Sequence, residues 1–318
     1  MSDAGEELVL GIDVGGTYTR AVAVSLAGRI LGRAERQAGN PRTTSERASR
    51  DAVLAAVHAV RDQARGRVRH VTLGIAGLIM AGEADERTRW RELIGADNVL
   101  VDSDARIAHA AAFGRAPGVC VVAGTGSQCL AFGPSGERVR VGGWGPRFGD
   151  EGSAYWIARR AIASALHDMD RAEETSMLRT LAAYAGVAMG APPSERTRRL
   201  VNVLYDPALP LGHHARFAEE VGRLAGEGDA GAAALLAEAG RQLAEQALVA
   251  GARAGTARVA GSGGVLRGNA EVRRSFEAAL RDRGAEPVTP WTTPELGAAY
   301  LSLVALGVDA DACAAGWG

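Results

Sequence analysis

The sequence predicts an α/β protein built from two halves that follow the same plan. A short apolar strand, a glycine turn and a returning strand occur near residue 15, and the same order occurs again near residue 125. Helical patterns follow each hairpin, and Pro117 with Gly118 separates the two halves. We therefore expect a first unit over residues 1–116 and a second unit over residues 117–292.

In the first half, alternating or continuous apolar runs predict strands, and apolar residues at helical spacing predict helices. Asp102, Ser103 and Asp104 precede a helical run, and short polar side chains in that place cap free backbone N–H groups. Strands are expected over residues 7–13, 19–25, 29–36, 71–75 and 98–101. Helices are expected over residues 44–65 and 88–94, and from the cap at residues 102–104 to about residue 113.

The second half follows the same rules as far as residue 292, and the chain then adds one more helix. Strands are expected over residues 118–123, 128–132, 138–141 and 258–260, helices over 153–166 and 269–281, two or three helices between 174 and 251, and an extended stretch at 287–288. We expect the last helix, over residues 293–306, to pack back on the first unit. The tail over residues 307–318 is rich in Ala, Gly and Asp, and we expect it to fray.

Composition excludes several classes of function. Thirty-six basic and thirty-seven acidic side chains give a net charge of −1, which creates no field that favours nucleic acid or an anionic membrane. All 36 basic residues are arginine, so a lysine-containing P-loop, a pyridoxal Schiff base and a lysine general base are excluded. The chain has no basic N-terminal leader and no long apolar run, so we expect a cytoplasmic protein.

The cysteines and histidines form no metal-binding pattern. Cys120, Cys129 and Cys313 make no CxxC pair, and the six histidines make no HExxH motif. We expect free thiols in a reducing compartment and no zinc site.

Three glycine turns follow predicted strands, over residues 15–17, 124–127 and 261–264. Consecutive amide N–H groups in such turns bind anions, and the first two turns suit opposite sides of one polyphosphate. Asp13, at the end of the first strand, could hold Mg²⁺ through water.

Two further features suggest a site for a hydroxylated substrate. Asp104 could take a proton from a substrate hydroxyl as a general base, and Asp102 competes with it for this role. The segment over residues 142–153 has glycine at five of twelve positions, which is typical of a ligand-binding loop. Within it, Asp150 could accept hydrogen bonds from sugar hydroxyls, and Trp144 could offer a ring face.

Seven short motifs follow one another along the chain in the order typical of one superfamily: DVGGT, GN, AG, SDA, GTGS, GGWG…GDEGS and GSGG. In this order they resemble the motifs of the ASKHA superfamily of actin, sugar kinases and heat-shock ATPases. The segment GGWGPRFGDEGSAYWIARRA, residues 142–161, is similar to that of the N-acetylglucosamine kinase branch, the BadF/BadG/BcrA/BcrD ATPase family. The resemblance covers about residues 10–305 and implies two RNase-H-like lobes with a central cleft. It also implies a homodimer that transfers phosphate from ATP, with Mg²⁺, to the 6-hydroxyl of N-acetylglucosamine.

The resemblance assigns roles position by position, with Asp104 as the general base. Gln128 departs from the pattern, because the family can carry Asn there, and this leaves the choice of sugar open. The positions that would contact ATP are Gly15, Gly16, Thr17, Thr125, Gly126, Ser262 and Gly263. The positions that would line the sugar site are Asn40, Gly77, Asp104, Ser127, Gln128, Gly143, Trp144, Gly145 and Asp150.

Other readings stay open beside this one. A kinase for glucosamine or N-acetylmuramic acid would use the same fold and base with a different pocket. An ATPase that activates a 2-hydroxyacyl-CoA dehydratase would need cysteine ligands for a shared iron–sulfur cluster, whereas Cys120 and Cys129 look like apolar strand residues. A sugar-sensing regulator would need a DNA-binding domain, and only ten residues precede Gly11.

Overall fold

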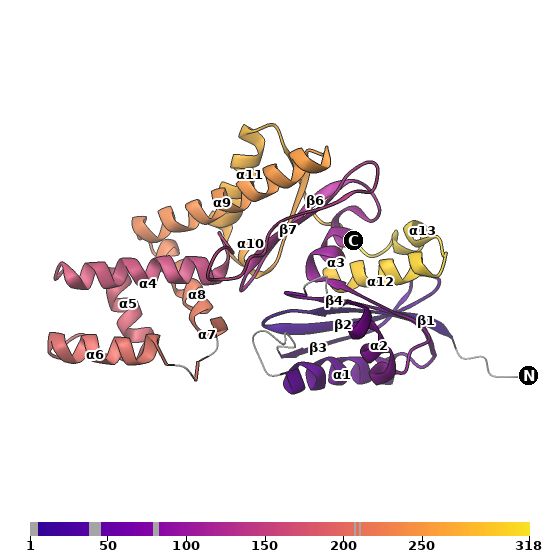
Figure 1. Ribbon diagram of the computed structural model, residues 1–318, viewed down its shortest axis with the longest axis horizontal. Coiled ribbons are helices and arrows are strands. Elements are labelled where there is room, and N and C mark those ends of the chain that lie inside the picture. The colour runs from indigo at the N-terminus through magenta and orange to yellow at the C-terminus, as the bar shows by residue number, and fades with distance from the viewer. Residues whose placement is uncertain (1–5, 38–45, 79–82, 207, 210) are drawn as a thin grey trace, which may run out of the picture.

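The computed structural model describes residues 6–37, 46–78, 83–206, 208–209 and 211–318, and this part of the chain forms two five-stranded sheets (Figure 1). The strand order is β3-β2-β1-β4-β5 in the first sheet and β8-β7-β6-β9-β10 in the second. In both, three strands form an antiparallel meander, and two later strands run parallel to its first strand. The repeated hairpin in the sequence therefore corresponds to one topology used twice.

The strands of the first sheet are β1 (Glu7–Val14), β2 (Tyr18–Ser25), β3 (Ile30–Gln37), β4 (Arg67–Ile75) and β5 (Val99–Ser103). Those of the second sheet are β6 (Gly118–Ala123), β7 (Ser127–Phe132), β8 (Arg138–Gly142), β9 (Arg258–Ser262) and β10 (Glu286–Val288). We call each sheet, with the helices that cover it, a lobe.

Helices cover both faces of the first sheet, which is why β1 is apolar on both sides. Alternate residues of β1, such as Leu10 and Val9, enter two different apolar cores, one with α1 and one with α12. A Cβ at Gly11 would lie 2.0 Å from the carbonyl oxygen of Glu295, so only glycine lets α12 lie this close to β1. The helices of this lobe are α1 (Glu46–Gln63), α2 (Glu83–Ile94), α3 (Asp104–Phe113), α12 (Pro294–Ala305) and α13 (Ala310–Ala314).

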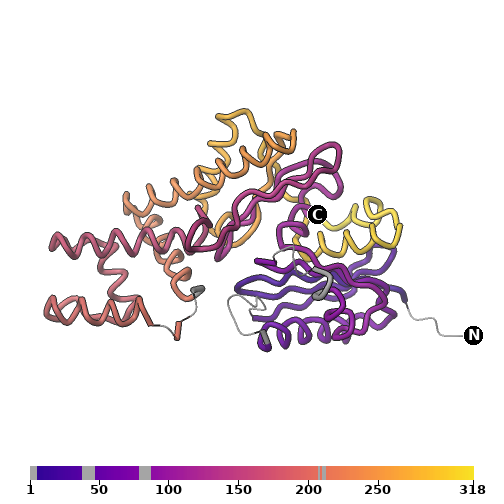
Figure 2. Tube along the Cα trace, viewed as in Figure 1, coloured from indigo at the N-terminus to yellow at the C-terminus, as the bar shows by residue number. Residues whose placement is uncertain are grey.

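The end of the chain is ordered on the first lobe, so the expectation of a frayed tail is wrong. The tail forms α13, and the indole Nε1 of Trp317 donates a hydrogen bond of 2.7 Å to the carbonyl oxygen of Gly28. Trp317 is 8% exposed and stacks with Trp291. Composition alone suggested fraying, but one buried tryptophan supplies the apolar area that anchors the segment. Figure 2 shows this yellow segment lying on the indigo lobe.

The second lobe is covered mainly by helices from one continuous stretch of chain. The long helix α9 packs along β7 and β8, and α11 packs on α9. Between α4 and α9 the structure has four helices, so residues 174–251 contain five helices rather than the two or three expected. The helices of this lobe are α4 (Ala154–Asp170), α5 (Ser176–Tyr184), α6 (Pro193–Leu204), α7 (Leu211–Ala215), α8 (Phe217–Gly226), α9 (Ala230–Ala254), α10 (Gly264–Gly268) and α11 (Ala270–Asp282).

Helix α3 joins the two lobes, because it packs on α12 and β4 on one side and on β6 and β7 on the other. The guanidinium of Arg106 lies 4.7 Å from the centre of the Phe132 ring, and the His109 ring lies 4.8 Å from it. Burial lowers the pKa of His109 to about 4, so this ring is neutral at pH 7 and packs as an apolar group.

No helix in the described ranges combines the length and the apolar character that a bilayer crossing requires. The three cysteines are free thiols.

Candidate functional site

The second and third glycine turns lie side by side at the carboxyl ends of β6 and β9. Gly263 has a φ of +95°, and a Cβ there would lie 2.2 Å from the carbonyl oxygen of Ala123. The two strands are parallel neighbours, with Val122 opposite Ser262. The turns therefore share one sheet edge, at the end of the strands where open α/β sheets bind ligands.

The turn between β6 and β7 also rests on the N-terminus of α4. The carbonyl oxygen of Gly124 accepts a hydrogen bond of 2.9 Å from the N–H of Ala154, and that of Thr125 accepts one of 3.2 Å from Tyr155. A Cβ at Gly126 would lie 2.7 Å from Oδ2 of Asp150. The turn therefore brings Asp150, 24 residues further along the chain, against its own backbone.

Asp150 is a buried carboxylate on a constrained backbone. It is 7% exposed and has a φ of 60°, and one other described non-glycine residue, Ala172, shares a positive φ. Ser127 lies beside it, because the Ser127 hydroxyl donates a hydrogen bond of 2.8 Å to the carbonyl oxygen of Glu151. Backbone strain of this kind persists where the surrounding structure imposes it, and it is concentrated at functional sites.

The first glycine turn, residues 15–17, joins β1 to β2 and presents Thr17 on the surface. The turn after β4 lies next to this end of β1, because the N–H of Ala76 donates a hydrogen bond of 3.0 Å to the carbonyl oxygen of Val14. Gly77 follows with a φ of +72°. Two of the segments suggested by the sequence therefore meet at the carboxyl end of β1.

The carboxyl group of Asp13 is half-buried at the end of β1. Burial, followed by the negative charges of Asp104 and Glu295, raises the pKa of Asp13 to about 7. Arg20 and Arg267 act in the opposite direction. A bound divalent cation would favour the ionised form, which is the form that can accept hydrogen bonds from metal-bound water.

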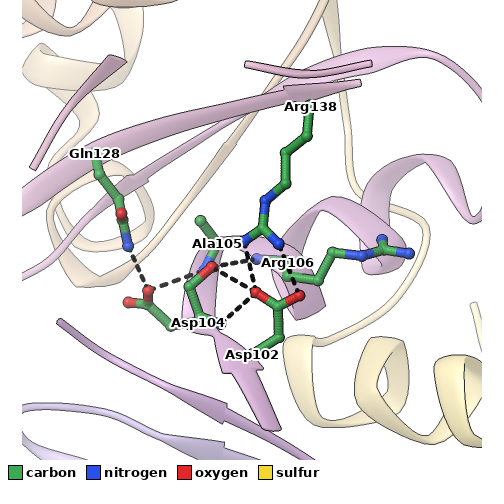
Figure 3. Close-up of polar contacts among 7 residues, drawn as sticks. Asp102, Asp104, Ala105, Arg106, Gln128 and Arg138 are labelled. Carbon is green, nitrogen blue, oxygen red and sulfur yellow. Dashed lines mark hydrogen bonds and ion pairs between the residues drawn. The ribbon is translucent and has the colours of Figure 1, made fainter. Parts of the chain in front are cut away.

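Asp104 is the first residue of α3, and the preceding Ser103 caps the helix, so the capping role considered for Asp104 is wrong. Oδ1 of Asp104 accepts a hydrogen bond of 2.9 Å from the N–H of Ala105 and one of 2.6 Å from the side-chain amide of Gln128 (Figure 3). Burial raises the pKa of Asp104 to about 6, although these two hydrogen bonds lower it. A carboxylate with a pKa just below neutrality suits general-base catalysis.

Asp102, the competing carboxylate, is held by an arginine of the other lobe. Arg138 donates hydrogen bonds of 2.7 Å to Oδ1 and 3.2 Å to Oδ2 of Asp102 (Figure 3). The N–H of Ser103 donates one of 2.6 Å to Oδ1. Both carboxylate oxygens are therefore engaged. This geometry favours Asp104 over Asp102 as the group that takes a proton.

The glycine-rich loop lies beside Gln128. A Cβ at Gly143 would lie 3.1 Å from Cβ of Gln128, and Gly143 has a φ of +69°. The carbonyl oxygen of Gly143 accepts a hydrogen bond of 2.5 Å from Arg140, whose guanidinium lies over the ring of Trp144. The Trp144 side chain is 74% exposed, and Gly145 follows it with a φ of +86°.

Sequence reasoning missed three arginines of this region. Arg138 holds Asp102; Arg20 binds Glu35 at 2.8 Å; and Arg267, on α10 after the third glycine turn, is exposed. Arg267 forms no ion pair with any residue in the described ranges. Isolated arginines among 36 carry no motif, so the sequence held no signal for them.

One predicted site residue, Asn40, lies outside the described residues. Within the described ranges, no group of three or more His, Cys, Asp or Glu side chains is placed to hold a metal ion. Any Mg²⁺ here would depend on water and on a ligand's phosphates, which is the usual way this ion is bound beside nucleotides.

Comparison with known proteins gives one family match. The model of the BadF/BadG/BcrA/BcrD ATPase family matches residues 10–302. The N-acetyl-D-glucosamine kinase of Dictyostelium discoideum is 31% identical over 190 residues, which cover 55% of this chain and 60% of that relative. The N-acetylmuramic acid/N-acetylglucosamine kinase of Clostridium acetobutylicum is 32% identical over 145 residues, covering 46% of this chain and 45% of the relative.

Both matches therefore span less than two thirds of the relative's own length. Similarity to a solved structure covers a larger share of the chain than these two sequence matches do. The crystal structure of a candidate N-acetylglucosamine kinase from Chromobacterium violaceum matches 94% of this chain and 99% of its own, with a TM-score of 0.75 and 25% identity.

Proposed function

Because this chain belongs to the BadF/BadG/BcrA/BcrD ATPase family and has the two-lobed fold of actin-like ATPases and sugar kinases, we propose that it is an ATP-dependent amino-sugar kinase. The proposed acceptor is the 6-hydroxyl of N-acetylglucosamine, and the proposed general base is Asp104. The observation that carries the proposal is the half-buried Asp104 carboxyl group, with a pKa of about 6, beside the glycine-rich loop and the Gln128 amide.

The glycine turns form the proposed ATP site, since their backbone N–H groups can surround phosphates without lysine. This site is assigned to Gly15, Gly16, Thr17, Thr125, Gly126, Ser262 and Gly263. Support comes from the contact of Gly263 with Ala123, which brings the second and third turns to one sheet edge.

The sugar is proposed to bind against the glycine-rich loop and the ends of β5 and β7. Its site is assigned to Asn40, Gly77, Asp104, Ser127, Gln128, Gly143, Trp144, Gly145 and Asp150. Support comes from the packing of Asp150 on Gly126 and of Gln128 on Gly143, which joins the sugar side of the site to the phosphate side.

In the proposed reaction, the oxygen of the acceptor hydroxyl attacks the γ-phosphorus of ATP while its proton passes to the Asp104 carboxylate. The bond from the γ-phosphorus to the β–γ bridging oxygen breaks, and ADP leaves with that electron pair. The proton on Asp104 then passes to solvent. Positioning and charge stabilisation dominate such a transfer, because little covalent work is required of the protein.

Mg²⁺ would be held by ATP phosphates and by water that donates to Asp13, whose half-buried carboxylate fits that role. When bound, the ion would neutralise charge on the phosphates. The protein is further proposed to be a homodimer, which light scattering of the purified protein tests. It is also proposed to lie in the cytoplasm, which fractionation of cells tests.

A second candidate substrate is N-acetylmuramic acid, which the Clostridium acetobutylicum relative takes according to its name. Gln128 keeps this candidate open, because its side chain is one methylene longer than the Asn that the family can carry at this position.

The test is sugar-dependent ADP release with MgATP across N-acetylglucosamine, N-acetylmuramic acid, glucosamine, N-acetylmannosamine and glucose. Strong stimulation by an N-acetylated sugar supports the proposal, and NMR of the product identifies the phosphorylated hydroxyl. Stimulation by glucosamine alone removes the acetyl pocket from the proposal. Release of ADP that no sugar increases contradicts it.

A further inference from the structure

The side-chain amide of Gln128 lies between Asp104 and the glycine-rich loop. Its Nε2 donates a hydrogen bond of 2.6 Å to Oδ1 of Asp104 (Figure 3). On the other side lies Gly143, where an added Cβ would come within 3.3 Å of Oε1 of Gln128. The absence of a side chain at Gly143 therefore leaves room for the amide in this position beside the carboxylate.

The two oxygens of Asp104 differ in their surroundings. Both hydrogen bonds that other described residues donate to the Asp104 carboxylate, from Gln128 and from the N–H of Ala105, go to Oδ1. Two donors on one oxygen fix the plane of the carboxylate, and Oδ2 is left to face the substrate.

The contact between Gln128 and Asp104 also crosses between the lobes. Gln128 is on β7 of the second lobe, opposite Gly142 of β8, and Asp104 begins α3 after the last strand of the first lobe. The side chain of Gln128 has the length needed to bridge this distance, and the neighbouring pair of Arg138 and Asp102 crosses the same boundary.

We propose that Gln128 is a positioning residue for the general base. Its amide holds Oδ1 of Asp104, so that Oδ2 accepts the proton of the sugar hydroxyl. This role rests on the proposed kinase function and goes beyond lining the sugar site, because Gln128 acts through another residue.

The titratable and charged groups around Asp104 are Asp13 of β1, Asp102 of β5 with its partner Arg138, and the buried thiol of Cys120 on β6. Burial and the charge of Asp102 raise the pKa of Asp104, and the amide of Gln128 lowers it. Loss of the amide therefore raises this pKa and moves the acid limb of the rate profile to higher pH.

The test compares Gln128→Ala, Gln128→Asn and Gln128→Glu with the unmodified enzyme, using saturating MgATP and the sugar that the enzyme phosphorylates. We expect kcat near pH 6.5 to fall about 10–100-fold in the first two variants, the effect of losing a hydrogen bond to a charged group. The Gln128→Asn variant should behave like Gln128→Ala, because the Asn side chain is one methylene too short to reach Oδ1 of Asp104. Glu keeps the size but removes the donor and adds a charge, so its acid limb should move furthest.

The sugar KM separates a positioning role from a simple sugar contact. For positioning, KM should change less than about threefold while kcat falls. The matched control is Gln242→Ala, since the Gln242 amide donates a 2.7 Å hydrogen bond to Glu238 on α9, away from the site. In this control variant, kcat, the sugar KM and the pH profile should be the same as in the unmodified enzyme.

A raised KM with an unchanged kcat and an unchanged acid limb overturns the positioning role and leaves Gln128 as a sugar contact. Absence of sugar-dependent turnover in the unmodified protein instead contradicts the kinase function itself. Circular dichroism checks folding, and if Gln128→Ala does not fold, the Asn and Glu variants decide the outcome.

Discussion

Arg138, at the start of β8, donates two hydrogen bonds of 2.7 and 3.2 Å to the carboxylate of Asp102, at the end of β5, and so joins the two sheets. The side chains are 28% and 12% exposed. Two residues further along, Asp104 bonds to an amide rather than to a cation. Two carboxylates from one short segment therefore have different chemistry, one paired and one able to take a proton.

The ion pair of Arg138 and Asp102 should stabilise the folded protein. Arg138→Ala should lower the free energy of unfolding by about 1–3 kcal/mol, below the roughly 3–5 kcal/mol for a fully buried pair, because solvent still reaches both groups. Urea unfolding measures the change. Arg67→Ala is the control, since Arg67 and Asp97 form an exposed pair that should contribute under about 1 kcal/mol. An equal loss in both variants would contradict the prediction.

The pH dependence of turnover should report Asp104. Its pKa of about 6 predicts that kcat/KM falls below about pH 6 and levels off above it, because a general base must be unprotonated. Asp104→Asn should lose about 10²–10⁴ of kcat above pH 6, where Asp104 of the unmodified enzyme is ionised, while calorimetry still detects sugar binding. Near-normal kcat in that variant would move the role to Asp102 or Asp150.

Asp13 should lower stability at neutral pH. Its pKa is about 7 in the folded chain against 3.8 for the free group, so folding favours its protonated form. The resulting stabilisation is complete below about pH 4 and is lost as pH rises through 7. Asp13→Asn should therefore raise the melting temperature at pH 8 by at least about 2 °C.

The same variant should melt like the unmodified protein near pH 3, where Asp13 is mostly protonated in both the folded and the unfolded chain. Scanning calorimetry without nucleotide or metal at the two pH values makes the comparison. A rise in melting temperature of the same size at both pH values would show that the charge of Asp13 is not the cause of the rise.

Arg267 should contribute to binding of ATP phosphates. It is exposed on α10, and its charge acts on Asp13 across the ends of the two lobes. Arg267→Ala should raise the KM for MgATP about 3–10-fold, a partial loss for an exposed charged contact, with a smaller change at high salt. Arg281→Ala is the control, because Arg281 pairs with Glu277 on α11 at 2.9 Å. An unchanged KM would place the phosphates away from α10.

The sequence predicted the strands and turns around the site because their signals are local. Apolar runs that end in glycine mark β1, β6 and β9, and short polar residues mark the start of α3. Parallel pairing then brings the ends of β6 and β9 to one edge, which is enough to predict that two glycine turns meet.

Contacts between distant segments left no such signal. The pair of Arg138 and Asp102 joins residues 36 positions apart, and the burial of Trp317 depends on an acceptor at Gly28, 289 positions away. Nothing in the neighbourhood of either residue distinguishes it from other arginines or tryptophans. The helices between α4 and α9 were undercounted because they are short and the breaks between them are short, with the single residue Arg216 between α7 and α8.

The closure of the first lobe by α12, α13 and Trp317 also sets an order of events during synthesis. The second lobe comes from one continuous stretch, residues 118–288, and can fold as soon as that stretch leaves the ribosome. The first sheet is made earlier, but the helices that cover one of its faces come some 200 residues later, a delay of about 10–40 s at ordinary translation rates. The part of that apolar face that α12 and α13 later cover stays open during this interval, so nascent chains stalled between residues 118 and 290 should be the ones that recruit chaperones.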